Sequence, residues 1–211
     1  MVRRLSLLAL VLYGPQELEH ASPPSCRPLS RDDRTIAGIV VGGMTLEDAA
    51  RRLGPAKLQR RGHGHEFRQA LCYRSAGAND DTVLVFANGN TERNDTVVTS
   101  AYLGPASGAS VNLGSCVASP RVSRALRFAS GPSRGAELGT AARWLGVSRS
   151  LIERRCTSAP PDEEDSVAGL PTMCVDAPDE PRPDGTTLVV VGLHCEGDRV
   201  TSLAMAWSDF W

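Results

Sequence analysis

Residues 38–54, with the sequence GIVVGGMTLEDAARRLG, contain the clearest folding signals in this chain of 211 residues. The apolar lead-in ends at two glycines, which break a strand. Thr45 is a favoured N-cap residue, and Asp48 follows at the position of a capping-box acid. Apolar side chains then recur at helical spacing, at Leu46, Ala49, Ala50 and Leu53. Gly54 ends the pattern, so the stretch predicts a short helix that must pack against another element to persist.

A weaker copy of this stretch occurs at residues 130–146, where Leu145-Gly146 aligns with Leu53-Gly54. In each half the helical stretch is followed by a cysteine-bearing strand and then by an antiparallel hairpin. The hairpin strands are expected at residues 82–86, 97–103, 187–193 and 200–207. We therefore predict an α+β fold of two tandem modules, residues 35–116 and 117–211. Each module would place short helices on one face of a small antiparallel sheet.

The N-terminus predicts export. Residues 1–4 carry two arginines, and residues 5–13 form a mostly apolar run that is too short to span a bilayer as a helix. We interpret residues 1–21 as a signal peptide and the polar residues 22–34 as a flexible arm. The net charge of −1 lacks the basic excess of a nucleic-acid-binding protein. We expect an exported protein, periplasmic or secreted, without a stable membrane span.

The chain has six cysteines and no Cys-x-x-Cys pair, which argues against a zinc ribbon or a thioredoxin-type site. An even number of cysteines in an exported chain favours disulfides. We predict the bonds Cys72–Cys116 and Cys156–Cys174, one within each module. The partners of Cys26 and Cys195 stay open, and so does lipidation of Cys26.

The pattern Gly43-Met44-Thr45, an acid, small residues and Leu53-Gly54 resembles small exported modules of the β-lactamase-inhibitor-protein type. A similar signature marks small outer-membrane assembly lipoproteins. The resemblance covers residues 38–103 and, weakly, residues 130–207, where Ala136-Glu137 replaces Met44-Thr45. It implies helix-plus-sheet modules that bind other proteins and have no catalytic activity. It transfers no binding residue, because the shared letters are structural.

Two residue clusters keep an enzyme open as the alternative. His63, His65 and Glu66 are three potential metal ligands, although zinc sites have three or four protein ligands and no further one is evident nearby. Gly131-Pro132-Ser133-Arg134-Gly135 has the form of a nucleophile elbow, which requires a strand before it and a helix after it. Asp176 or Asp179 with His194 would complete a triad in the order that such hydrolases use.

The sequence favours a non-catalytic module that binds another protein through an open sheet face. On this interpretation it needs no cofactor and no metal. Aromatic residues are common anchors of protein interfaces, and five of them are our candidate contacts: Tyr73, Phe86, Tyr102, Trp207 and Trp211. The alternatives are a metal-dependent enzyme and a structural component of the cell envelope.

Overall fold

The structure is a computed structural model that describes residues 25–61, 68–88, 97–109, 111–157, 166–167, 170–176 and 188–208. The described part of the chain is mostly antiparallel β-sheet, with 43% strand and 21% helix. The predicted α+β class is therefore wrong. The difference arises because the predicted hairpins extend and pair with one another, whereas the helices stay short.

Sixteen described elements follow one another along the chain. The strands are β1 (Thr35–Ile36), β2 (Ile39–Val40), β3 (Gln59–Arg61), β4 (Arg68–Ser75), β5 (Thr82–Asn88), β6 (Ser100–Pro105), β7 (Val117–Ser119), β8 (Ser166–Val167), β9 (Leu170–Asp176), β10 (Leu188–Glu196) and β11 (Arg199–Ser208). The helices are α1 (Leu46–Leu53), α2 (Leu138–Leu145), α3 (Arg149–Thr157) and the 3-10 turns η2 (Ala106–Gly108) and η3 (Leu113–Ser115).

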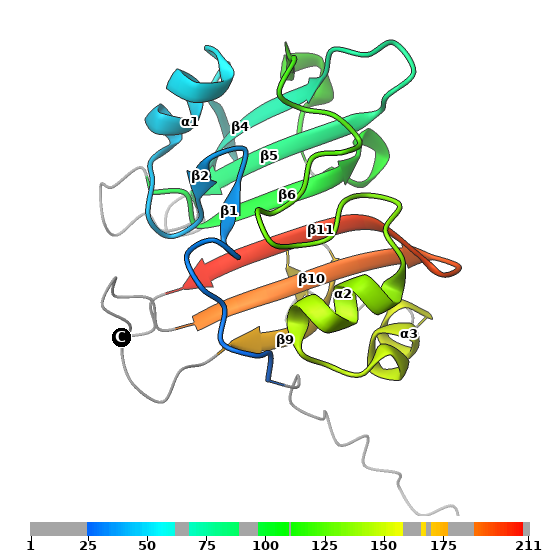
Figure 1. Cartoon of the computed structure of the whole chain (residues 1–211). Helices are drawn as coiled ribbons and strands as arrows, with labels where there is room; N and C mark the ends of the chain where they lie inside the picture. Colours follow the sequence, from blue (N-terminus) through cyan, green and yellow to red (C-terminus); the bar gives the residue numbers. More distant parts are fainter. Residues whose placement is uncertain are drawn as a thin grey trace, which may run out of the picture.

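One continuous sheet replaces the two small sheets that we predicted. Its strand order is β3-β4-β5-β6-β11-β10-β9-β8, and β7 pairs in parallel with β4. The two halves join where β6 pairs antiparallel with β11, from Leu103 opposite Leu203 to Ser100 opposite Ala206. The order of strands from the edge to this junction is the same in both halves (Figure 1). The proposed internal repeat stays a prediction.

The halves also share one core. A single cluster of buried side chains includes Leu84 and Phe86 from the first half and Leu145 and Leu203 from the second. The helices and the β1–β2 hairpin lie in front of the sheet in Figure 1, and α1 contacts β4 and β5 while α3 contacts β9 and β10. Among the described residues the two halves thus contribute to one main core, and the division into two modules at residue 116 stays a prediction. The sheet has one face turned toward these elements and one turned away.

Helix α1 begins as the sequence predicted. Thr45 Oγ1 accepts the Asp48 backbone N–H at 3.1 Å, and the Asp48 carboxylate accepts the Thr45 backbone N–H at 3.0 Å. Leu46, Ala49 and Leu53 are the buried residues of this helix. The capping box sets the start of α1, and the three apolar residues hold it against the sheet.

We expect Thr45→Ala to lower the free energy of unfolding by about 1 kcal/mol, because it leaves an N-terminal N–H of α1 without its acceptor. Thr140→Ala, inside α2, is the matched control and should change stability by less than about 0.5 kcal/mol. Urea denaturation of the three proteins measures both values. A Thr45 variant no less stable than the control would contradict this role of the cap.

The apolar lead-in before Gly42 does not form one strand. It forms the hairpin β1–β2, whose turn has two residues. Ala37 and Gly38 both have positive φ, +52° and +79°, and turn the chain between β1 and β2. Gly42 has φ +78°, and a Cβ there would lie 2.5 Å from Cδ1 of Trp207. This close approach of backbone to an indole ring explains why a glycine stands at position 42.

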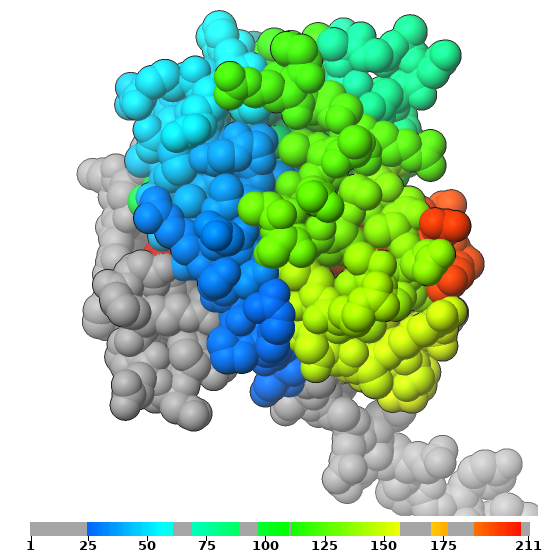
Figure 2. Space-filling view, in the orientation of Figure 1, coloured from blue at the N-terminus to red at the C-terminus, as the bar shows by residue number. Residues whose placement is uncertain are grey.

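Residues 25–34, part of the predicted flexible arm, are anchored in the structure. Cys26 is bonded to Cys174 of β9, and the Cys26 N–H donates to Val175 O at 2.9 Å. Asp33 is 2% exposed and accepts hydrogen bonds from the side chains of Arg27, Ser30, Ser130 and Trp144. Figure 2 shows this segment beside the connecting segment around residues 120–135, and Ala129 N–H donates to Thr35 O at 2.7 Å. The arm therefore joins the two halves in front of the sheet.

Three disulfides link the six cysteines, and they fit an oxidising, exported location. Cys72 is bonded to Cys116, which is the pairing that we predicted. The prediction of Cys156–Cys174 is wrong, because Cys156 of α3 is bonded to Cys195 of β10 and Cys174 to Cys26. Spacing along the chain cannot choose between β9 and β10, which are neighbours in the sheet.

Candidate binding face

A row of uncharged residues crosses seven strands on the sheet face turned away from the helices. Its members occupy directly paired positions from β9 to β3, and each is half-buried. In spatial order they are Val175, Val190, Ala206, Ser100, Ala87, Ala70 and Gln59. We call them the cross-strand row. Since side chains alternate between the two faces of a strand, the row lies opposite to core residues such as Phe86 and Met205.

The length of the cross-strand row matches the width of a protein interface. Paired strands lie about 4.8 Å apart, so seven strands extend over roughly 29 Å. A standard interface of about 800 Å² per partner corresponds to a patch roughly 30 Å across. The row contains no charge whose desolvation would oppose binding, and the centres of interfaces are depleted in charged residues.

The next residues on the same face are buried by the chain itself. A second apolar cluster contains Cys72, Val85, Tyr102 and Ala204. Ala106, Ala109, Val111 and Cys116, from the segment between β6 and β7, pack against this cluster. Part of the face is thus closed, whereas the cross-strand row stays accessible.

Leu113 extends the accessible apolar surface at the β3 end of the row. It is 41% exposed and is the large exposed hydrophobic side chain among the residues that the structure describes. Gln59, the last member of the row, donates through Nε2 to Asn112 O at 3.2 Å and accepts the Asn112 N–H through Oε1 at 2.9 Å. This pair of hydrogen bonds places η3, and with it Leu113, next to the row.

Three of the aromatic residues that we proposed as partner contacts are buried. Tyr73 and Phe86 belong to the main core, and Tyr102 belongs to the second cluster. Burial raises the pKa of Tyr73 to about 12, and its hydroxyl donates to Gly54 O at 3.1 Å. Burial also raises the pKa of Tyr102, whose hydroxyl donates to Pro105 O at 3.0 Å. These side chains stabilise the fold and cannot touch a partner of the folded protein.

The two C-terminal tryptophans have different outcomes. Trp207 is half-buried, packs against the core and lies over Gly42. Its ring therefore supports the turn at residue 42 more than it offers surface to a partner. Trp211 lies outside the described residues, so its role as a contact stays a prediction.

The structure describes only some of the residues on which the enzyme alternatives depend. His63, His65 and Glu66 lie outside the described residues, and no group of three metal-binding side chains occurs among the described ones. Ser133 is half-buried in an irregular segment before α2, where its backbone forms an isolated antiparallel β-bridge with Arg127. His194 Nδ1 lies 2.8 Å from Thr201 Oγ1, and the Asp176 carboxylate accepts the Leu29 N–H. Asp179 is also outside the described residues.

No protein-family model, no curated protein and no solved structure matches this chain. Among the described helices, none combines the length and the apolar character that crossing a membrane requires. The function proposed for this chain is therefore inferred from its own geometry.

The sequence pattern did not predict the cross-strand row, because none of its residues is aromatic and most are small. We predicted aromatic contacts, whereas the structure leaves the alanines and valines of the cross-strand row half-exposed. One signal was present: small residues alternate with large ones in β11, where Ala204 and Ala206 flank Met205. Alternation of this kind indicates a strand with two different faces.

Proposed function

We propose that this chain is an exported, non-catalytic protein that binds another protein through the cross-strand row and Leu113. The observation that carries the proposal is the row itself, which is uncharged, half-exposed and continuous over seven paired strands. An inhibitory role would follow if the partner were an enzyme whose active site the face covers. That role agrees with what the resemblance to β-lactamase-inhibitor-type modules implies.

The small side chains define the kind of partner that fits. Alanine, valine and serine make a shallow surface with few rotamers to immobilise, so binding costs little side-chain entropy. The partner must supply the bulky contacts, such as an aromatic or aliphatic side chain seated on Ala206 and Ala87. Leu113 would contribute a large apolar contact from this chain.

The test is to place a bulky charge in the centre of the row. Ala206→Arg should weaken partner capture at least about tenfold, which corresponds to about 1.4 kcal/mol, because the partner would have to desolvate a guanidinium. Folding is checked by circular dichroism and by the absence of free thiols, since an arginine at a half-buried site can extend to solvent.

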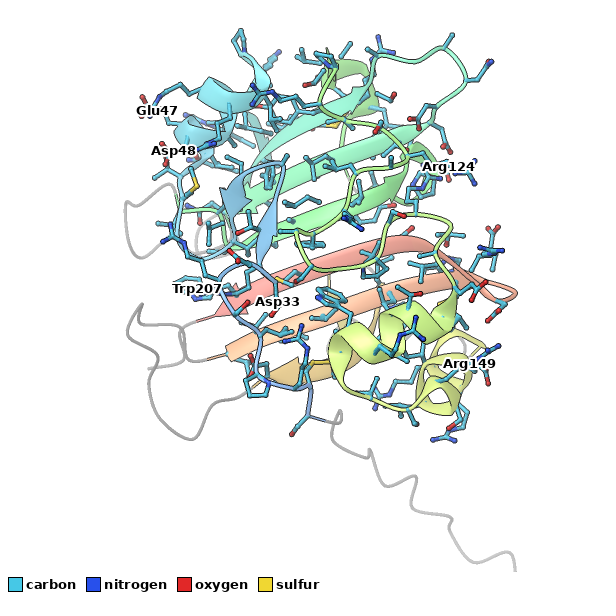
Figure 3. All side chains as sticks on the ribbon, viewed as in Figure 1. Asp33, Glu47, Asp48, Arg124, Arg149 and Trp207 are labelled. Carbon is cyan, nitrogen blue, oxygen red and sulfur yellow. A yellow bond between two sulfur atoms is a disulfide. The ribbon has the colours of Figure 1, made fainter. Side chains whose placement is uncertain are left out.

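Ala125→Arg is the matched control. Ala125 is exposed and adjoins Arg124, which Figure 3 labels at the end of the molecule opposite to Trp207 and thus far from Ala206. The tagged proteins are incubated with the exported fraction of the source cells, and the captured proteins are quantified by mass spectrometry. A partner recovered equally by both variants, or no partner for the native chain, would contradict the proposal.

A further inference from the structure

The two sides of the sheet are closed by very short strands. Beyond β4 lie only the three-residue strands β3 and β7 among the described elements, and beyond β9 lie β8, with two residues, and an isolated bridge from Ser25 to Val175. The outermost long strand of a sheet exposes a row of unpaired N–H and C=O groups that can pair with another chain. In this protein β4 and β9 are such strands, with eight and seven residues.

We call β3, β7, β8 and the bridge at Ser25 the covers. Each cover pairs with a different part of β4 or β9. On β4, residues 68–70 pair with β3 and residues 73–75 pair with β7, which leaves Leu71 and Cys72 between the two covers. On β9, Leu170 and Pro171 pair with β8, whereas Val175 pairs with Ser25. A strand of three residues has too few ladder bonds to persist by itself.

Two of the three disulfides lie at these covers. Cys72 of β4 is bonded to Cys116, which immediately precedes β7. Cys174 of β9 is bonded to Cys26, which immediately follows Ser25. The third disulfide joins α3 to Cys195 of β10, an interior strand with β9 on one side and β11 on the other. Two of the three disulfides therefore attach a cover segment to an edge strand of the sheet.

Two side-chain contacts also hold β7 and the turn before it. Ser119 Oγ donates to Leu53 O at 3.2 Å, and the Gln59–Asn112 pair holds the preceding turn. A tether keeps the local concentration of the cover far above the concentration of any competing strand. Without the tether, a strand from a second molecule competes with β7 for the same backbone groups.

We infer that the Cys72–Cys116 disulfide keeps the edge of β4 closed, and that β4 pairs with β4 of a second copy of this chain once the bond is lost. Antiparallel pairing of β4 with itself, centred between Leu71 and Cys72, would displace β3 as well as β7 and would place Arg68 opposite Ser75 and Arg74 opposite Gln69. No two like charges then face each other, and opposed like charges are what destabilises such pairs. Cys26–Cys174 serves the edge of β9 in the same way.

The experiment compares two double variants that differ mainly in the position of the lost bond. Cys72→Ser/Cys116→Ser opens the edge, whereas Cys156→Ser/Cys195→Ser removes the interior bond. Their sequence separations, 44 and 39 residues, are close, so the loss of loop-closure entropy is nearly equal. Sedimentation velocity at several concentrations should show dimers and larger species for the first variant and monomers for the second and for the native chain.

Hydrogen exchange locates the contact. In the dimer the β4 amides that point away from β5, which are every second amide between Ala70 and Arg74, should exchange at least about tenfold more slowly than in the same variant diluted to a monomer. A folded edge variant that stays monomeric overturns the inference, and so does equal self-association of the interior variant.

A second measurement covers the case in which the edge variant does not fold. The native protein is treated with limiting dithiothreitol, a dithiol that transfers two electrons and two protons to one protein disulfide and becomes a cyclic disulfide itself. The freed thiols are alkylated and located by peptide mapping. Molecules alkylated at Cys72 and Cys116 should be enriched in the dimer fraction; their confinement to the monomer fraction would overturn the inference.

Discussion

Removing the Cys26–Cys174 disulfide, in the variant Cys26→Ser/Cys174→Ser, is expected to lower the free energy of unfolding by about 5 kcal/mol. The bond closes a loop with a sequence separation of 148, the longest of the three. In the chain-entropy model a longer loop restricts the unfolded chain more and so stabilises the folded state more. The bond also anchors the N-terminal arm, whose Arg27 N–H donates to Leu145 O at 2.8 Å.

Guanidinium denaturation without reductant measures this loss. Cys156→Ser/Cys195→Ser, with a sequence separation of 39, is the control and should lose about 4 kcal/mol. Proteins of this size have net stabilities of about 5–15 kcal/mol, so the first variant is expected to be marginal at 37 °C. A smaller loss in the Cys26 variant than in the control would show that the long loop does not dominate.

Replacing Asp33 with alanine is expected to cost about 2–3 kcal/mol. Its carboxylate is buried and accepts two hydrogen bonds from the Arg27 guanidinium, at 2.6 and 3.0 Å, and one from Trp144 Nε1 at 3.1 Å. Figure 3 labels Asp33 in front of the sheet, in the arm that joins the two halves. Without the carboxylate, the buried Trp144 Nε1–H loses its acceptor and the partly exposed Arg27 guanidinium loses its ion-pair partner. Leaving a buried donor unpaired is costlier than removing both partners.

Asp32→Ala is the matched control for Asp33→Ala, because Asp32 is the exposed neighbour in the chain. We expect it to change stability by less than about 0.5 kcal/mol. Asp33→Asn should lie between the two, since an amide keeps the shape and one acceptor oxygen but loses the charge. Thermal and urea denaturation of the three variants measure these differences. Equal stability of the Asp32 and Asp33 variants would disprove the role of the Asp33 cluster.

Asp33 also makes stability depend on pH. Burial by itself would raise its pKa, but the hydrogen bonds from Arg27, Ser130 and Ser30 outweigh burial and hold the pKa far below the usual range. The unfolded chain has an ordinary Asp pKa of about 3.9. The stabilisation is therefore complete above that pH and is lost as the pH falls toward the folded-state pKa. Urea titrations between pH 6 and pH 2 should show a weaker acid dependence for Asp33→Asn than for the native chain.

The sequence by itself determined the local elements. The start of α1 at Thr45 was predicted, and so was the end of α2 at Gly146, whose φ of +71° needs a glycine. The hairpin strands and the Cys72–Cys116 pairing were also predicted. Apart from the disulfide, whose cysteines are 44 residues apart, these features depend on contacts between residues close in the chain or on a side-chain period of two or 3.6, and both can be recognised in one sequence.

Only the tertiary structure decided the rest. The pairing of β6 with β11 merges the two predicted sheets. The sequence of either strand does not specify its partner, because backbone hydrogen bonds are the same for any strand. The tertiary structure also decided that Cys26 is bonded to Cys174, that the arm around Asp33 is anchored, and that three predicted contact residues are buried, namely Tyr73, Phe86 and Tyr102. The cross-strand row exists only once seven strands from distant parts of the chain are set in register. Pairing over long sequence separations is chosen by the packing of the whole core, which a single stretch of sequence does not encode.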